Sequence, residues 1–188
     1  MAASDEPRAA VIFLPLTLGA AIGSFTRAYD PALERTVGPH VTVVFPSRPA
    51  PPGALEDRLW AICRGLAPFV VDFDAVLEWP DGPDGAQRLV VLRVGEGRAT
   101  LAALTAAAEV RDELATPHPE PYLPHLTLAT GLPPSVAAMA AREAERFVGV
   151  AAFEVEALTV GSVDASGVFR ADAVVPLAPL AGGAGGER

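Results

Sequence analysis

Residues 39–44 read Pro-His-Val-Thr-Val-Val, and residues 124–129 read Pro-His-Leu-Thr-Leu-Ala. Both stretches follow one frame, Pro-His-apolar-Thr-apolar-apolar, and two of the chain's three histidines occupy it. Given the composition, chance places two of three histidines in this frame on the order of once in a thousand. The repeat therefore indicates a duplicated feature on which the fold and the function depend.

Apolar residues alternating with His and Thr are typical of a β-strand. Residues i and i+2 of a strand point to the same face, so His40 shares a face with Thr42, and His125 shares one with Thr127. If the two strands face a common cleft, two imidazoles and two hydroxyl groups converge there. We expect this set to form the centre of the site.

Such a set suits in-line attack on a phosphodiester. Two imidazoles near neutral pKa can take one proton and give another, and hydroxyl groups can donate hydrogen bonds to phosphate oxygens. A metal centre is not indicated, because neither histidine belongs to an H-E-x-x-H motif and the single Cys63 has no partner cysteine. We therefore expect no metal ion and no other cofactor.

The two H-x-T motifs, 85 residues apart in a chain of 188, resemble those of the 2H phosphoesterase superfamily, which includes the RNA 2′,3′-cyclic phosphodiesterases also called 2′-5′ RNA ligases. Tyr-Asp-Pro at 29–31 and Phe-Pro at 45–46 are similar to a bacterial branch of that family. The resemblance spans nearly the whole chain.

The resemblance implies a bilobal α+β fold with two antiparallel-rich sheets, outer helices and a central cleft. A pseudo-twofold axis would relate the lobes, each supplying one motif. The resemblance also makes His40 and His125 the catalytic residues, with Thr42 and Thr127 as substrate-binding residues.

Length and composition favour one bilobal domain over residues 9–180, with a disordered stretch at 1–8 and a flexible Gly-rich tail at 181–188. The net charge of −9 argues against extended nucleic-acid binding, which requires many Lys and Arg side chains. The apolar run at 11–18 lacks the basic flank and length of a signal or membrane helix. One cysteine rules out an internal disulfide, which is consistent with a cytoplasmic protein. We also expect a monomer that contacts no membrane.

Periodicity and turn residues predict the remaining elements. We expect strands at 9–18, 40–45, 69–77, 88–94, 125–130, 153–163 and 168–176, with turns at 79–86 and 164–167. We expect helices around 22–29, from Asp30-Pro31 to Gly38, at 55–66, 98–115 and 134–148.

Five further side chains outside the two motifs are candidates for a structural or functional role. Trp79, in the segment that carries the turn signals, could stack on a nucleobase or pack at the hairpin base. Tyr122 precedes the second motif and could line the pocket. Surface positions are expected for Arg27 and for His118, which has no H-x-T context. Cys63 lies on an apolar helix face, so we expect a buried structural thiol.

The leading hypothesis is a metal-independent cyclic phosphodiesterase that hydrolyses a 2′,3′-cyclic phosphate on an RNA end, a nucleotide or a related small molecule. The alternative is a non-catalytic nucleotide- or phosphate-binding module that retains the H-x-T site. The acidic charge favours this alternative, as do Thr130 and Gly131, which stand where relatives often carry a basic residue. A third reading makes the motifs two buried structural pairs.

Overall fold

The computed structural model describes residues 6–49, 51–82, 84–115 and 121–178. Its strands are β1 (Arg8–Phe13), β2 (His40–Ser47), β3 (Phe69–Val71), β4 (Phe73–Asp81), β5 (Gln87–Val94), β6 (His125–Leu132), β7 (Phe153–Val155), β8 (Ala157–Val163) and β9 (Phe169–Pro176). Its helices are α1 (Leu16–Tyr29), α2 (Pro31–Thr36), α3 (Ala54–Cys63), α4 (Arg98–Ala108) and α5 (Pro134–Ala144), with 3-10 turns at Arg111–Glu113 and Glu145–Phe147.

Seven strands form one antiparallel sheet in the order β4-β5-β6-β2-β1-β8-β9, and β3 pairs with β7 in a second, two-stranded sheet. Within the described residues, β2 and β6 share one paired position, Val41 with Leu126. The pairs on either side of this junction are longer, as between β5 and β6. The large sheet therefore consists of two halves that meet at the two motif strands.

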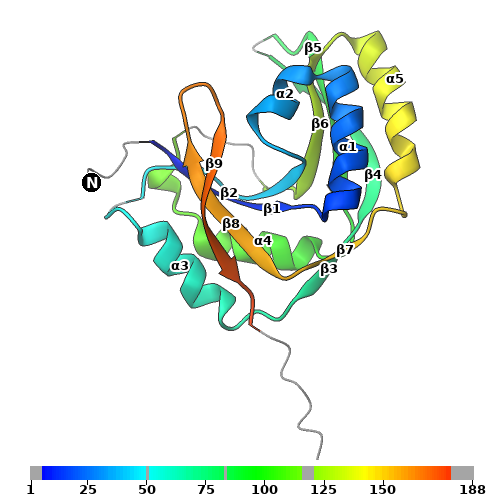
Figure 1. Cartoon of the computed structure of the whole chain (residues 1–188). Helices are drawn as coiled ribbons and strands as arrows, with labels where there is room; N and C mark the ends of the chain where they lie inside the picture. Colours follow the sequence, from blue (N-terminus) through cyan, green and yellow to red (C-terminus); the bar gives the residue numbers. More distant parts are fainter. Residues whose placement is uncertain (1–5, 50, 83, 116–120, 179–188) are drawn as a thin grey trace, which may run out of the picture.

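The helices cross between the two halves. Helix α1 follows β1 but packs on β6, and α4 follows β5 but packs on β2. Helix α5 covers β4 and β5, whereas α3 packs on α4 and β9. Figure 1 shows α1 and α5 in the upper half of the picture and α3 and α4 in the lower half. Each motif strand is therefore supported by a helix from the other half.

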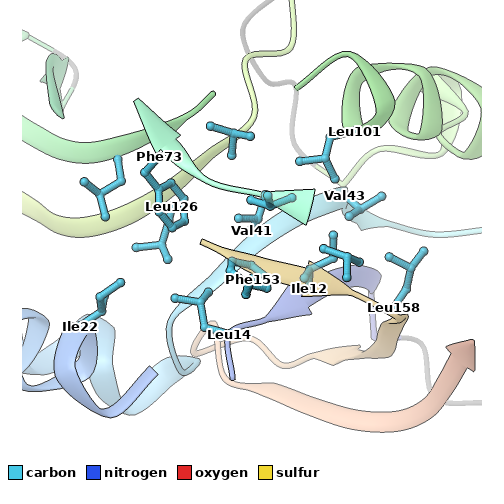
Figure 2. Packing of buried hydrophobic residues seen from close by; sticks show 14 of the residues in the cluster. Ile12, Leu14, Ile22, Val41, Val43, Phe73, Leu101, Leu126, Phe153 and Leu158 are labelled. Atoms are coloured by element: carbon cyan, nitrogen blue, oxygen red, sulfur yellow. The ribbon is translucent and has the colours of Figure 1, made fainter. Parts of the chain in front are cut away.

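The core lies on one face of the motif strands. Val41 and Val43 of β2 and Leu126 and Leu128 of β6 are fully buried. Figure 2 shows Val41 and Leu126 in the cluster that also contains Phe73. Because side chains alternate along a strand, the histidine and threonine of each motif point away from this core.

The α+β class and the bilobal, antiparallel arrangement are confirmed. The predicted N-cap is also correct, because the Asp30 carboxylate accepts a hydrogen bond from Leu33 N at 2.9 Å and Pro31 opens α2. Residues 1–5 and 179–188 lie outside the described residues, which places most of the 1–8 prediction and the whole tail prediction beyond them. Arg8 already belongs to β1.

Two predicted boundaries were wrong. The strand expected at 9–18 ends at Phe13, and helix α1 begins after Pro15, whose carbonyl accepts Gly19 N at 2.8 Å. Strand β4 continues through Trp79 to Asp81, where a turn was expected at 79–86. Proline is tolerated at position 80 because β4 is an edge strand, where a missing N–H donor removes no ladder bond.

Two strands predicted as continuous each break at one residue. Asp72 separates β3 from β4, and Glu156 separates β7 from β8. The breaks let β3 and β7 leave the large sheet and pair with each other. The predicted helices at 98–115 and 134–148 end earlier, at Ala108 and Ala144. No helix within the described ranges is long and apolar enough to cross a membrane.

Candidate active site

The pairing of β2 with β6 brings the two motifs onto one face of the sheet. Continuing the antiparallel register by one residue from the pair Val41–Leu126 places His40 across from Thr127. The second histidine likewise lies across from the first threonine. The two histidines are therefore diagonal neighbours across the strand pair, and Cα atoms in that relation lie about 7–8 Å apart. All four motif side chains, His40, Thr42, His125 and Thr127, are half-buried rather than sealed in the core.

Both imidazoles are held in the same way. His40 Nδ1 lies 2.9 Å from the carbonyl oxygen of Gly38, and His125 Nδ1 lies 2.7 Å from that of Leu123. A carbonyl oxygen only accepts hydrogen bonds, so Nδ1 carries the proton in each ring. The Nε2 atom of each ring is then the nitrogen with a lone pair, which is the atom that a general base requires.

The proline of each motif is held alike as well. Leu14 N donates to the carbonyl of Pro39 at 3.5 Å, and Val94 N donates to that of Pro124 at 3.0 Å. Each bond joins the start of a motif strand to the end of its neighbour, β1 or β5. The sequence repeat is therefore also a repeat of hydrogen bonds.

Burial lowers the pKa of both histidines from its ordinary value of 6.5, because a charged imidazolium is poorly solvated there. The pKa of His40 is lowered further by the charge of the neighbouring His125. The backbone hydrogen bonds at Nδ1 act in the opposite direction but do not cancel the effect of burial. Burial therefore favours the neutral form of both rings.

Aromatic side chains flank the two histidines differently. The ring of Phe13 lies 6.4 Å from that of His40 and 5.9 Å from that of Phe169, both edge to face. The indole of Trp79 lies closer to its histidine, 4.9 Å from the ring of His125 at an interplanar angle of 76°. Trp79 therefore lies in the site, in direct contact with a predicted catalytic residue.

A pocket of about 530 Å³ adjoins the second histidine. It is lined by Phe45, Trp79, Pro80, Leu89, Pro121, Tyr122, Leu123 and His125. Ligand pockets commonly measure about 300–1,000 Å³ and are mainly apolar with a few polar groups. This pocket fits that description, since the polar side-chain groups among its described lining residues are the His125 imidazole, the Tyr122 hydroxyl and the Trp79 indole N–H.

Tyr122 joins the pocket wall to the first motif. Its ring stands edge to face with Phe45 at 6.0 Å, and its hydroxyl donates a hydrogen bond to the backbone carbonyl of Thr42. The prediction that Tyr122 would line the pocket agrees with this placement, but its bond to the motif strand was not foreseen.

Carboxylates hold both motif strands five residues after the histidine. Asp30, at the end of α1, accepts Thr130 N at 3.0 Å and the Thr130 hydroxyl at 2.7 Å. Glu109, at the end of α4, accepts Phe45 N at 3.5 Å. These two contacts, which we call the crossed clamps, were missed because the sequence shows Asp30 only as a helix cap. Burial raises the pKa of Asp30, but hydrogen bonds from Thr130, Leu33 and Ala32 outweigh it and lower the pKa overall.

Arg27 and Cys63 lie apart from the site. Arg27 is exposed and pairs with Glu34 at 2.6 Å. Cys63 is fully buried in the core, as expected of a structural thiol. His118 lies outside the described residues. Across the described ranges, no three His, Cys, Asp or Glu side chains gather as metal ligands would.

The model of the 2′-5′ RNA ligase superfamily matches residues 14–167, which is most of the chain and includes both motifs. No curated protein matches the chain.

Solved structures show the same fold. Escherichia coli LigT complexed with NADP+ is 19% identical, with a TM-score of 0.60, over 93% of this chain and 99% of that chain. Usb1 from Kluyveromyces marxianus is 13% identical, with a TM-score of 0.58 and the same coverage. A structure described as a phosphoesterase is 16% identical, with a TM-score of 0.58, over 92% of this chain and 99% of that chain.

Proposed function

This chain belongs to the 2′-5′ RNA ligase (2H phosphoesterase) superfamily, and on that premise we propose that it is a metal-independent 2′,3′-cyclic phosphodiesterase. Membership supports a phosphodiesterase-type activity in general terms. The cyclic substrate, the metal-free chemistry and the roles of individual residues are the proposal. We propose further that the protein acts as a cytoplasmic monomer.

The reaction would be an in-line attack of water on phosphorus. Nε2 of one histidine takes a proton from the water as its oxygen bonds to phosphorus. Nε2 of the other gives a proton to the ribose oxygen as its bond to phosphorus breaks. Hydroxyl groups of Thr42 and Thr127 donate to the non-bridging oxygens, where charge increases in the transition state. The product is a nucleoside phosphomonoester.

One observation carries this proposal: two imidazoles with protonated Nδ1 and two hydroxyl groups share one face of paired strands. The lowered pKa values of His40 and His125 favour the unprotonated ring, which is the form that the general base requires. The histidine that acts as the general acid must first bind a proton at Nε2. An anionic phosphate between the rings favours imidazolium and supplies that condition when the substrate binds.

The pocket beside His125 favours a nucleotide or a short RNA end over a long polymer. Trp79 and Tyr122 offer aromatic surfaces for a base, and base–aromatic stacking contributes about 1–3 kcal/mol. The net charge of −9 opposes contact with many backbone phosphates. Structures of similar fold have been determined with uridine monophosphate and with 3′-AMP.

A panel of nucleoside 2′,3′-cyclic phosphates and cyclic-ended oligonucleotides tests the proposal, with products followed by ³¹P NMR in excess chelator. We expect hydrolysis to a monoester by the wild type and no detectable product on the same timescale from the His40→Ala/His125→Ala double variant. Loss of turnover in chelator that a divalent ion restores would refute the metal-free mechanism.

The same panel tests the alternative of a binding module. A module of that kind would bind nucleoside monophosphates, turn over no member of the panel, and lose only modest affinity in His40→Ala. The acidic charge and the non-basic residues Thr130 and Gly131 after the second motif favour this alternative.

A further inference from the structure

The junction between the two halves of the sheet is weakly paired. Strands β2 and β6 share the position Val41–Leu126, and the described residues show no further ladder pair between them. Among the described residues, the next bridge on the β6 side of β2 joins Ser47 to Leu114. Other groups must therefore fix the first motif relative to the second.

Directly after the first histidine, side chains form hydrogen bonds with the backbone of β2. The Thr105 hydroxyl donates to the carbonyl of Val43 at 2.8 Å, and Phe45 N donates to Glu109 at 3.5 Å. Both of these groups come from α4. A further bond, to the carbonyl of Thr42, comes from the Tyr122 hydroxyl.

Tyr122 differs from the α4 groups because it belongs to the segment that leads into the second motif. The next two residues are fixed in the site: the Leu123 carbonyl holds the His125 ring, and the Pro124 carbonyl accepts Val94 N. A single side chain thus connects the backbone of Thr42 to the start of β6, three residues before His125.

We propose that the Tyr122 hydroxyl is a positioning group that sets the separation between the two H-x-T motifs, a role distinct from that of its ring in the pocket wall. The inference rests on the proposed function, because its consequence is measured as turnover. If the bond is lost, Thr42 and the second motif can move apart, and a misplacement of about 1 Å can lower a rate about 100-fold.

The proposed role requires the hydroxyl to remain a donor. Burial raises the pKa of Tyr122, the nearby Thr105 hydroxyl opposes this increase, and the charge of Glu109 adds a smaller increase. The phenol therefore stays protonated throughout the range in which the histidines titrate. The position equivalent to Tyr122 before the first motif is Val37, which has no side-chain donor. The side-chain link between the two motifs is therefore made by the residue before the second motif and not by its counterpart before the first.

Two substitutions separate the hydroxyl from the ring. Tyr122→Phe keeps the ring in the pocket and removes the donor, so we expect kcat to fall about 10- to 100-fold with KM within twofold. Tyr122→Ala also removes pocket wall, so KM for a nucleoside cyclic phosphate should rise as kcat falls. The pH optimum of Tyr122→Phe should match that of the wild type.

Tyr29→Phe is the matched control. Tyr29 is the chain's other tyrosine, and its hydroxyl donates to Glu143 at 2.7 Å away from the site. We expect this variant to keep wild-type kcat and KM. Rates are compared per folded protein, well below the melting temperature of every variant, so that loss of stability does not enter kcat.

The outcomes are separable. A Tyr122→Phe enzyme with kcat within twofold of the wild type, or with a changed KM and an unchanged kcat, overturns the positioning role and leaves the proposed function intact. A wild type that hydrolyses no member of the cyclic phosphate panel refutes the proposed function and this inference together. A selective fall in kcat supports the role.

Discussion

His40 and His125 hold their rings through the same bond, from Nδ1 to the carbonyl oxygen two residues earlier, yet different groups surround them. The ring of Phe13 lies 6.4 Å from the first imidazole, whereas the indole of Trp79 lies 4.9 Å from the second and also lines an apolar pocket. The residues that repeat are those of the proposed proton transfers. Those that differ would bind the part of the substrate that is not symmetric, its nucleoside.

Removing either imidazole should give the largest effect on kcat. The two substitutions should have similar effects, although the surroundings of the two histidines differ. His40→Ala and His125→Ala should each lower kcat by about 10²–10⁴, because acid and base are both needed in the same step. The double variant should be little worse than either single one. Steady-state rates on one cyclic nucleotide, with circular dichroism to verify folding, measure this.

A single variant that retains more than about a tenth of wild-type kcat would contradict paired acid–base catalysis. Arg142→Ala, on the outer surface of α5, serves as a control because it leaves both motifs intact. It should behave as the wild type does.

Truncating the flanking aromatic residues should expose the asymmetry. Trp79→Ala should raise KM for a nucleoside cyclic phosphate about 5- to 150-fold, which corresponds to about 1–3 kcal/mol of stacking. Phe13→Ala should change KM by less, because the described pocket lies beside His125 and does not include Phe13. Titration with nucleoside monophosphates provides a second measurement. Equal effects of the two variants would show that the nucleoside does not occupy the pocket.

The crossed clamps should differ in strength. Asp30→Asn removes the charge from a buried carboxylate that accepts hydrogen bonds from Leu33 N, Thr130 N and the Thr130 hydroxyl, so we expect a loss of about 1–3 kcal/mol in the free energy of unfolding. Glu109→Gln should cost less, since its bond to Phe45 N is long at 3.5 Å. Urea denaturation compares them. A larger loss in Glu109→Gln would reverse this ranking.

Acidification should produce the smallest effect. The folded-state pKa of both histidines is below the ordinary value of 6.5, so the unfolded chain binds protons first as the pH falls. Stability should therefore be greatest above about pH 6.5 and decline from there toward the lowered pKa values. Melting temperatures from pH 7.5 to 5 measure this decline. It should be smaller in a His40→Asn/His125→Asn variant, and an equal decline would contradict the assignment.

The repeated frame allowed the motif strands and the orientation of His40 and Thr42 to be predicted, because strand alternation is a local property. The Asp30 cap was predictable for the same reason. Leu16 to Leu18 were assigned to a strand because an apolar run has no period of its own, and Pro15 decided the boundary. Trp79 was placed in a turn since turn residues follow it closely, although an edge strand accommodates them.

Contacts between distant parts of the chain could not be predicted from one sequence. The Asp30–Thr130 bond joins residues 100 positions apart, and the Tyr122–Thr42 bond joins residues 80 apart. Nothing local distinguishes Asp30 as a clamp from Asp30 as a cap, because one carboxylate does both. The side chains that support the site therefore required the fold, whereas its chemical groups did not.

The crossing of α1 onto β6 and of α4 onto β2 makes the two halves depend on each other for assembly. A chain cleaved between α3 and β3 would give an amino-terminal fragment whose β2 has lost α4 and a carboxy-terminal fragment whose β6 has lost α1. In neither fragment alone would a motif strand pack against its helix. Mixing the two fragments should restore both packing contacts together. Each half of the sheet therefore depends for its support on a helix that the other half supplies.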